Sequence, residues 1–230
     1  MLIGPQNLAV HVNHVRSRIS RAALAAGRDP ASVTLIAVSK AKPAESVRAA
    51  ATAGVTDFGE NYLQEALGKM DRLADLALHW HFIGGIQSNK TRAIAERFEW
   101  VHSIDRLSVA RRLSEQRPFH APALNVCIQV ALVPESTKGG VDPAILAELA
   151  LQMAELPRLR LRGLMAIPPP QPDLQAERAV FSRLGILLRH LNARGLELDT
   201  LSMGMSADFE SAIAEGATHV RIGTAIFGSR

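Results

Sequence analysis

Short apolar runs alternate with longer amphipathic segments along nearly the whole chain. The first run, LIAVSK at residues 35–40, has four apolar positions and ends on a lysine. Seven similar runs also predict strands: DFGE (57–60), HFIG (81–84), WVHSI (100–104), LNVCIQVAL (124–132), LRGLMAI (161–167), TLSMG (200–204) and HVRIG (219–223). Short and largely apolar runs are typical of strands that are covered on both faces of a parallel sheet.

Helix-periodic segments rich in alanine and leucine separate these runs. They include PAESVRAAATAG, NYLQEALGKMDRLADL, DPAILAELALQMAEL and AERAVFSRLGILLRHLNARG, which begin near Pro, Asp or Asn and in several cases stop at a glycine. Another helix is predicted over residues 5–27, ahead of the first strand. Strands that alternate with helices indicate a parallel sheet with crossover helices.

Eight such strands in 230 residues predict an α/β fold, a (β/α)8 TIM barrel with an extra N-terminal helix. We expect a single domain over residues 1–230, with the helix in residues 1–30 and the barrel in residues 33–229. An open doubly wound sheet is the alternative. That fold usually has a glycine-rich fingerprint after its first strand, and the segment LIAVSKAKP has none.

The composition, 47% hydrophobic and 21% charged, is that of an ordinary globular protein. The net charge is +4, but the basic residues are scattered, so we expect no nucleic-acid partner. No stretch approaches the roughly 18 consecutive apolar residues of a membrane span, and the first residues do not resemble a secretory signal. The single cysteine, Cys127, is interpreted as a small buried side chain rather than a metal ligand. These features predict a cytoplasmic protein.

Binding groups in a barrel of this kind lie where the strands end. The first strand leads to Lys40, the seventh to Ser206, and the eighth carries Arg221 followed by Gly223 and Thr224. Ser206 is a candidate N-cap of the helix ADFESAIAEG, and capping alone is the simplest interpretation of a serine there. With glycine and threonine at the next strand end, it predicts a phosphate site, which in these barrels lies after strands seven and eight.

A lysine at one strand end, a phosphate site at another and an arginine between them indicate pyridoxal 5′-phosphate (PLP). The Lys40 amine would form an internal aldimine with the cofactor aldehyde, although most lysines at strand ends simply reach solvent. Arg221 would face the pyridine nitrogen and keep it unprotonated, which makes the ring a weak electron sink. No metal site is predicted, because no histidine cluster has metal-ligand spacing. One or both of His79 and His81 are first interpreted as hydrogen-bonded core residues.

Six segments closely resemble the pyridoxal phosphate homeostasis protein family: AVSKAKP, GENYLQEA, WHFIGGIQSNK, GLMAIPPP, TLSMGMSADFESAI and VRIGTAIFG. The match covers residues 33–229, and the family is similar to the barrel domain of bacterial alanine racemases. The resemblance assigns six residues to the cofactor, namely Lys40 at the covalent link, Asn61 beside it, Arg221 at the pyridine nitrogen, and Ser206, Gly223 and Thr224 at the phosphate.

Members of this family are regarded as carriers or regulators of PLP without an established catalytic reaction. The resemblance therefore implies storage, protection or transfer of the cofactor, with PLP-dependent apo-enzymes as candidate partners, and the chain is expected to be a monomer. One departure is visible, since the family often reads Ser-Lys-Ser/Thr-Gly where residues 136–140 are STKGG. This weakens any role of that loop that depends on a hydroxyl group at position 139.

Two enzymatic alternatives stay open at this point. A racemase-like enzyme would need a second proton donor on the face of the substrate opposite the lysine. The only tyrosine, Tyr62, directly follows Asn61 at the start of a helix. A Schiff-base aldolase using Lys40 is chemically feasible but leaves Arg221 unexplained.

Overall fold

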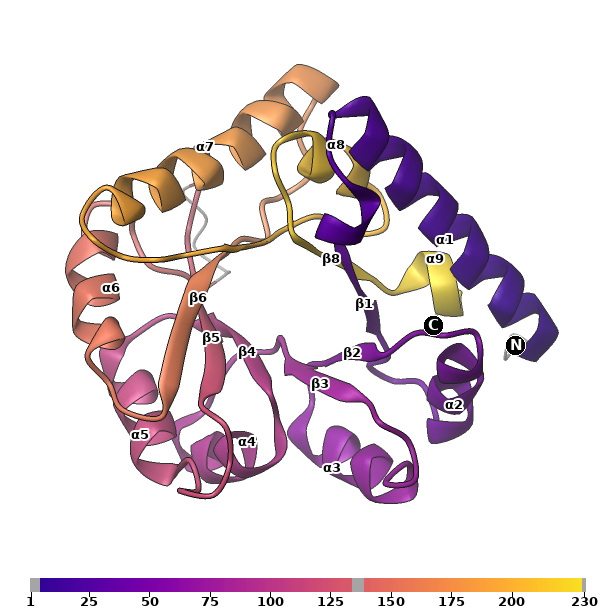
Figure 1. Cartoon of the computed structure of the whole chain (residues 1–230), viewed down its shortest axis with the longest axis horizontal. Coiled ribbons are helices and arrows are strands. Elements are labelled where there is room, and N and C mark those ends of the chain that lie inside the picture. The colour runs from indigo at the N-terminus through magenta and orange to yellow at the C-terminus, as the bar shows by residue number, and fades with distance from the viewer. Residues whose placement is uncertain (1–4, 134–138, 229–230) are drawn as a thin grey trace.

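Eight parallel strands form a closed barrel in the computed structural model, which describes residues 5–133 and 139–228 (Figure 1). Each strand pairs with its sequence neighbours, and β8 closes the barrel against β1. The strands are Thr34–Val38 (β1), Asp57–Glu60 (β2), His79–Phe82 (β3), Trp100–Ile104 (β4), Leu124–Gln129 (β5), Leu159–Met165 (β6), Thr200–Ser202 (β7) and His219–Ile222 (β8). The predicted TIM-barrel fold is confirmed.

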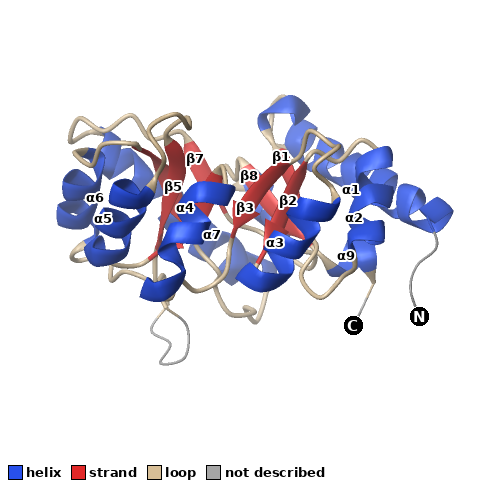
Figure 2. Ribbon diagram, turned by 90° about the horizontal axis from the view of Figure 1, so that it is seen from below, coloured by secondary structure: helices blue, strands red, loops and turns tan. Residues whose placement is uncertain are grey.

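Helices surround the strands, as the side view in Figure 2 also shows. They are Pro5–Ala25 (α1), Ala44–Thr52 (α2), Leu63–Arg72 (α3), Thr91–Arg97 (α4), Leu107–Gln116 (α5), Leu146–Ala154 (α6), Leu174–Asn192 (α7), Phe209–Ala214 (α8) and Thr224–Phe227 (α9). None of the described helices is long and apolar enough to cross a membrane.

The predicted N-terminal helix is α1, which lies on the outside of the barrel against α2, α8 and α9. Its buried face follows the three- and four-residue spacing of an amphipathic helix, with Leu8, Val12, Val15, Ile19 and Ala23 all buried. The helix ends at Ala25, two residues before Gly27, whose φ of 66° is the left-handed conformation that glycine adopts without steric cost.

Most strand residues are buried on both faces, because side chains fill the barrel interior and helices cover its outside. The interior is not uniformly apolar. Four fully or almost fully buried polar side chains lie on different strands: His81 on β3, His102 on β4, Ser202 on β7 and Arg221 on β8. Burial of such groups is costly unless they are hydrogen-bonded, and each of the four has a hydrogen-bond partner.

Several strands end earlier than their predicted apolar runs, and three of them show why. The strand β1 stops at Val38, so Ser39 and Lys40 belong to the turn that follows it. The strand β5 stops at Gln129, and β7 has only three residues because Gly204, with a φ of 91°, turns the chain sharply after it. A Cβ atom at position 204 would lie 2.7 Å from the Cβ of Ala212, so the turn also requires glycine for space.

Candidate functional site

One cavity of about 330 Å³ lies at the carboxyl ends of the strands. Its lining includes all six residues that the sequence assigned to a cofactor, namely Lys40, Asn61, Ser206, Arg221, Gly223 and Thr224. They come from the ends of β1, β2, β7 and β8, which are distant in the chain but meet at one rim of the closed barrel. The barrel therefore brings together a primary amine, an amide, a guanidinium and two hydroxyl groups.

Apolar side chains complete the cavity, and they are Val38, Ile83, Ile167, Met205 and Ala207. Ile83 is buried, whereas Met205 is 37% exposed and stands at the rim. A mostly apolar cavity with a few converging polar groups is typical of a site for a small organic ligand.

A buried polar cluster holds the residue before Lys40. The Ser39 hydroxyl donates to Oε1 of Glu60 at 2.6 Å, and Nζ of Lys69 donates to the same oxygen and to the Ser39 carbonyl, both at 2.7 Å. Ser39 and Glu60 are fully buried and Lys69 is nearly so. Burial raises the pKa of the Glu60 carboxyl group, while the ammonium group of Lys69 acts in the opposite direction.

The residue after Lys40 is also fixed. Ala41 has a φ of 57°, and its backbone N–H donates to Oε2 of Glu65 at 2.9 Å. The turn closes with a bond from the Lys42 N–H to the Ser39 carbonyl at 3.0 Å. Because both neighbours of Lys40 are tied to α3 or to the end of β2, its side chain is directed from a rigid turn into the cavity.

Sequence reasoning missed this support, although one signal was present. Glu65 and Lys69 are four residues apart, the spacing of neighbours on one helix face. Glu60 sits at the end of a buried run, where a carboxylate needs a partner. What the sequence does not show is that α3 returns Lys69 to the turn after β1.

Asn61 lines the cavity and carries a buried amide oxygen, Oδ1, without a hydrogen-bond partner among the described residues. Its backbone packs so closely against Gly84 that a Cβ atom at position 84 would lie 2.3 Å from the Asn61 carbonyl oxygen. A buried polar atom without a partner requires an explanation, and a bound ligand is one.

The hydroxyl group of Ser206 lies at the start of α9. Its Oγ accepts a hydrogen bond from the Ala225 N–H at 3.3 Å. The expected role as N-cap of α8 is wrong, because residues 206–208 form a turn, α8 begins at Phe209 and Asp208 occupies its N-cap position. Ser206 instead caps a backbone N–H of the neighbouring helix.

Gly223 and Thr224 form the other side of this corner. Gly223 is the N-cap residue of α9, and a Cβ atom there would lie 3.3 Å from the carbonyl oxygen of Val38 and 3.5 Å from its Cβ. Thr224 is the first residue of the helix and its side chain is exposed to the cavity mouth. The first N–H groups of a helix have no partner within it, so the corner offers two hydroxyl groups and backbone donors to an anion.

Arg221 forms the floor of the cavity and is only 4% exposed. Its Nη1 donates to Oγ of Ser202 at 2.8 Å and its Nη2 donates to the Ala166 carbonyl at 2.9 Å. Burial lowers the pKa of Arg221 to about 10, with the charge of Asp208 acting against it. The guanidinium is therefore still cationic at neutral pH.

The other sequence candidates lie away from this cavity. Cys127 is fully buried, and burial raises the pKa of its thiol to about 12, as expected for an inert core residue. His81 is a fully buried, hydrogen-bonded core histidine as predicted, whereas His79 is exposed. Residues 136–138 of the STKGG loop lie outside the described residues.

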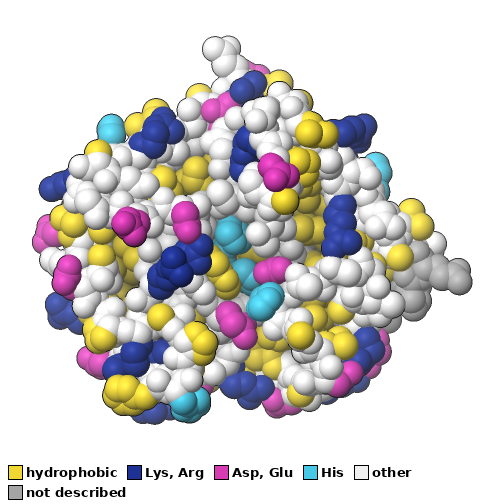
Figure 3. All heavy atoms as spheres, in the orientation of Figure 1, with side chains coloured by type: hydrophobic (Ala, Val, Ile, Leu, Met, Phe, Trp, Pro, Cys, Tyr) yellow, Lys and Arg dark blue, Asp and Glu magenta, His cyan; other side chains and the backbone are white. Residues whose placement is uncertain are grey.

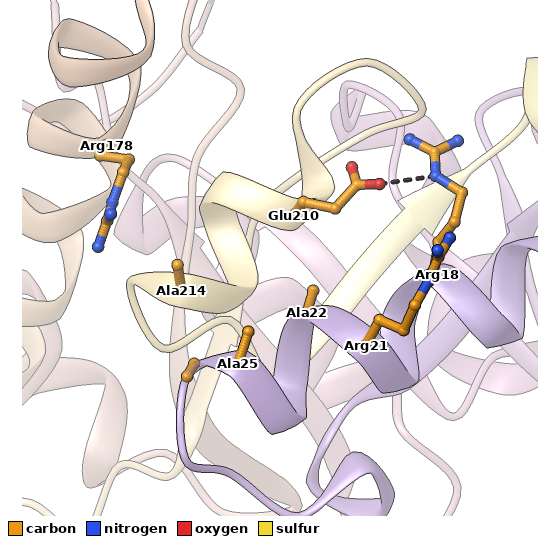
Figure 4. A pocket seen from close by; sticks show the side chains of 8 residues that line it. Arg18, Arg21, Ala22, Ala25, Arg178, Glu210 and Ala214 are labelled. Carbon is orange, nitrogen blue, oxygen red and sulfur yellow. Dashed lines mark hydrogen bonds and ion pairs between the residues drawn. The ribbon is translucent and has the colours of Figure 1, made fainter.

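A larger cavity of about 750 Å³ lies between α1, α7 and α8 (Figure 4). Its floor is made of alanines, and its cations are Arg18, Arg21 and Arg178. Nε of Arg18 pairs with Glu210 at 2.6 Å, and Arg178 pairs with Glu215 at 2.7 Å. This groove lies on the outside of the barrel and lacks the converging groups of the cavity at the strand ends.

The family model described as the alanine racemase N-terminal domain matches residues 10–230. The chain is 62% identical to the pyridoxal phosphate homeostasis protein of Pseudomonas aeruginosa over 223 residues, which is 97% of this chain and 96% of that protein. It is 50% identical to the protein of the same name from Escherichia coli K12 over 227 residues, 97% of each chain.

Solved structures show the same barrel. PipY of Synechococcus elongatus PCC7942, known without PLP and with PLP bound, is 40% identical, with a TM-score of 0.86 over 96% of this chain and 100% of that chain. The alanine racemase of Corynebacterium glutamicum is 19% identical, with a TM-score of 0.67 over 94% of this chain and 60% of that one. The likeness to the racemase concerns the fold alone.

Proposed function

Because the chain belongs to the pyridoxal phosphate homeostasis protein family, we propose that it binds PLP in the cavity at the strand ends and acts as a non-catalytic carrier of that cofactor. In this proposal Lys40 forms the covalent link and Arg221 faces the pyridine nitrogen. Ser206, Gly223 and Thr224 hold the phosphate, and Asn61 lies beside the cofactor. The observation that carries the proposal is that these six residues line one cavity.

The groups of the cavity fit PLP in their chemistry. The hydroxyl and backbone donors near Gly223 suit a dianionic phosphate, and glycine at that position leaves room that a Cβ atom would fill. The buried Oδ1 atom of Asn61 lacks a protein partner, and Val38 and Ile83 provide apolar surface for a flat ring. PLP would supply an aldehyde group, and the Lys40 amine would hold it covalently, with loss of water.

The non-catalytic part of the proposal is supported by the absence of a second base. Among the described residues that line the cavity, Lys40 is the only amine and there is no carboxylate, imidazole or phenol, while Arg221 stays charged. Tyr62 does not line the cavity; it is the N-cap residue of α3 and is 51% exposed. An arginine at the ring nitrogen also makes the cofactor a weak electron sink.

The proposal extends to location and partners. A carrier of PLP would act where PLP-dependent apo-enzymes fold, which places it in the cytoplasm with those enzymes as recipients. The monomeric state expected from the sequence remains part of the proposal.

The carrier proposal is tested by incubating the PLP-loaded protein with L-alanine and other L-amino acids in deuterium oxide. We expect loss of the α-proton signal no faster than with free PLP, because no second base opposes Lys40. We also expect PLP to activate an added apo-enzyme. Rapid exchange with inversion would favour a racemase, and exchange with retention would favour an enzyme that uses Lys40 alone.

A further inference from the structure

A continuous series of hydrogen bonds runs through the barrel from the floor of the cavity to the opposite rim. Nη1 of Arg221 donates to Oγ of Ser202 at 2.8 Å, and that oxygen lies 2.8 Å from Nδ1 of His102. Nε2 of His102 lies 2.9 Å from Nδ1 of His81, whose Nε2 lies 3.0 Å from Oδ1 of Asp57. The two histidines and Ser202 are fully buried. The series therefore joins β8, β7, β4, β3 and β2.

With both imidazoles neutral, the two ends of the series determine where its protons lie. A guanidinium only donates, and an ionised carboxylate only accepts. His81 must therefore donate from Nε2 to Asp57 and accept at Nδ1, which makes His102 donate from Nε2 and accept at Nδ1. The Ser202 hydroxyl then donates to His102 and accepts from Arg221. Both imidazoles are neutral in this arrangement, as burial requires, since it lowers the pKa of His81 and that of His102.

Asp57 is the anionic end of the series at the rim where the strands begin. It is the first residue of β2, and its Oδ2 accepts from the Thr56 hydroxyl at 2.6 Å. The two hydrogen bonds from Thr56 and His81 hold the pKa of its carboxyl group below the ordinary value despite partial burial. Figure 3 views this rim and shows histidine side chains in a hollow at its centre, with acidic and basic side chains beside them.

A metal site does not explain these histidines. The described residues contain no group of three or more His, Cys, Asp and Glu side chains arranged to hold a metal ion. Each ring nitrogen of His81 and His102 already has a partner in the series. The group at the other end of the series is Arg221.

The position of the Asp57 carboxylate, at the opposite end of the series, matters for the charge of Arg221. No described carboxylate forms an ion pair with its guanidinium, whose bonds to protein go to two neutral oxygens, Oγ of Ser202 and the carbonyl of Ala166. A carboxylate in direct contact would offset the positive charge at the cavity. With Asp57 separated from Arg221 by one hydroxyl and two neutral imidazoles, the orientation of the guanidinium is fixed while its charge and remaining N–H groups stay directed at the cavity.

We propose that Ser202, His102, His81 and Asp57 are positioning residues that hold Arg221 as a hydrogen-bond donor to the ring nitrogen of the bound cofactor. This inference rests on the proposed function for its ligand. It assigns a binding role to residues on the opposite side of the barrel from the cavity. It also explains why Ser202, His102 and His81 are buried in the barrel interior.

The first part of the test uses the ligand-free protein. Long-range ¹H–¹⁵N correlation spectra of the imidazole rings report the tautomer of each histidine. We expect His81 and His102 to be neutral near pH 7 and protonated on Nε2. A proton on Nδ1 of either ring would overturn the series, and this result does not depend on whether the protein binds PLP.

The second part compares PLP with a deaza analogue in which the ring nitrogen is replaced by C–H. We expect His102→Leu and Ser202→Ala each to weaken PLP binding about tenfold and to leave binding of the analogue unchanged, since only PLP accepts a bond from Arg221. Ser114→Ala is the matched control, because Ser114 is a buried serine that is hydrogen-bonded to the Pro157 carbonyl on another part of the barrel.

Asp57→Asn guards against variants that fail to fold, because Asp57 lies at the rim rather than in the core. This variant is expected to weaken PLP binding, as the other two variants do. Its circular dichroism spectrum should remain that of the folded protein. The inference alone would be overturned if the affinities for PLP and for the analogue changed equally. It would also be overturned if neither affinity changed in variants that remain folded and carry PLP on Lys40. Absence of PLP from Lys40 in the unaltered protein would instead contradict the proposed function.

Discussion

Lys40 is placed by its neighbours rather than by contacts of its own side chain. Ser39 is anchored to Glu60 and Lys69, and the N–H of Ala41 is anchored to Glu65. No hydrogen bond or ion pair to the Lys40 ammonium occurs within the described residues. A rigid turn with an unengaged amine at its tip is suited to covalent capture of an aldehyde, because the amine gives up no protein partner on reacting.

The unpaired amide of Asn61 gives a prediction that separates binding from stability. Asn61→Ala should weaken PLP binding about tenfold, because it removes an amide side chain from the lining of the cavity. The free energy of unfolding of the ligand-free protein should stay the same or increase, since the buried Oδ1 atom has no hydrogen bond to lose. Titration with PLP and urea denaturation measure the two effects.

Asn125→Ala is the matched control for this prediction. The Asn125 side chain donates to the Glu99 carbonyl at 3.2 Å and accepts from Arg162 at 3.1 Å, and it does not line the cavity. Its replacement should therefore lower stability and leave PLP affinity intact. The opposite pattern for the two variants would show that Asn61 supports the fold and not the ligand.

The phosphate corner gives a second prediction at this scale. PLP should bind far more tightly than pyridoxal, since each charge-assisted hydrogen bond contributes roughly 1.5–3 kcal/mol. The double variant Ser206→Ala, Thr224→Ala should reduce the ratio of the affinities for PLP and pyridoxal by more than tenfold. Thr52→Ala removes a hydroxyl group on α2 that bonds to the Arg48 carbonyl, and it should change neither affinity. Equal affinities for both compounds in the unaltered protein would exclude a phosphate site here.

At the scale of elements, the pair Glu60–Lys69 connects α3 to the ends of β1 and β2. Both side chains are almost completely buried. Removal of one partner of a buried ion pair leaves an uncompensated charge and typically costs roughly 3–5 kcal/mol. Lys69→Met should therefore lower the free energy of unfolding by about that amount near neutral pH. Glu60→Gln in the same chain should recover most of the loss.

The loss of stability in Lys69→Met should depend on pH. Burial already raises the pKa of Glu60 above its ordinary value of 4.5, and removal of Lys69 raises it further. The folded state then keeps a proton that the unfolded state releases, so stability falls as pH rises above about 4.5 and recovers as pH is lowered towards it. Urea denaturation at pH 5 and pH 7.5 measures this. A deficit that is equal at both values would show that Glu60 is not the cause.

The elements themselves were largely predictable because their signals are local. Strands covered on both faces have short apolar sequences, and apolar residues in the helices between them repeat with a 3.6-residue period. The error at Ser206 has a physical reason: the chain forms a turn after Gly204, so Asp208 occupies the N-cap position of α8, which packs closely against Gly204. The true partner of Ser206, the N–H of Ala225, lies 19 residues away and has no local signal.

For the whole molecule, the topology makes both the site and the internal series. Closure of the barrel places β1 beside β8, which brings Lys40, Gly223 and Arg221 to one rim. The cavity was predictable, because strand ends of this fold converge on one face. The contacts from Arg221 to Asp57 were not, because each one depends on inward-pointing side chains of different strands, and the sequence shows His81 and His102 only as polar residues within apolar runs.

The most direct test of the central claim is borohydride reduction of the PLP-loaded protein, followed by peptide mass mapping. Reduction makes the link between PLP and an amine permanent, so the modified lysine can be identified. The predicted result is a single adduct on Lys40 that disappears in Lys40→Ala. The adduct should persist in the control Lys42→Ala. Lys42 lies on the same turn as Lys40, and its side chain donates to the Phe227 carbonyl at 3.1 Å. An adduct that persists undiminished on another lysine in Lys40→Ala would contradict the assignment of the site.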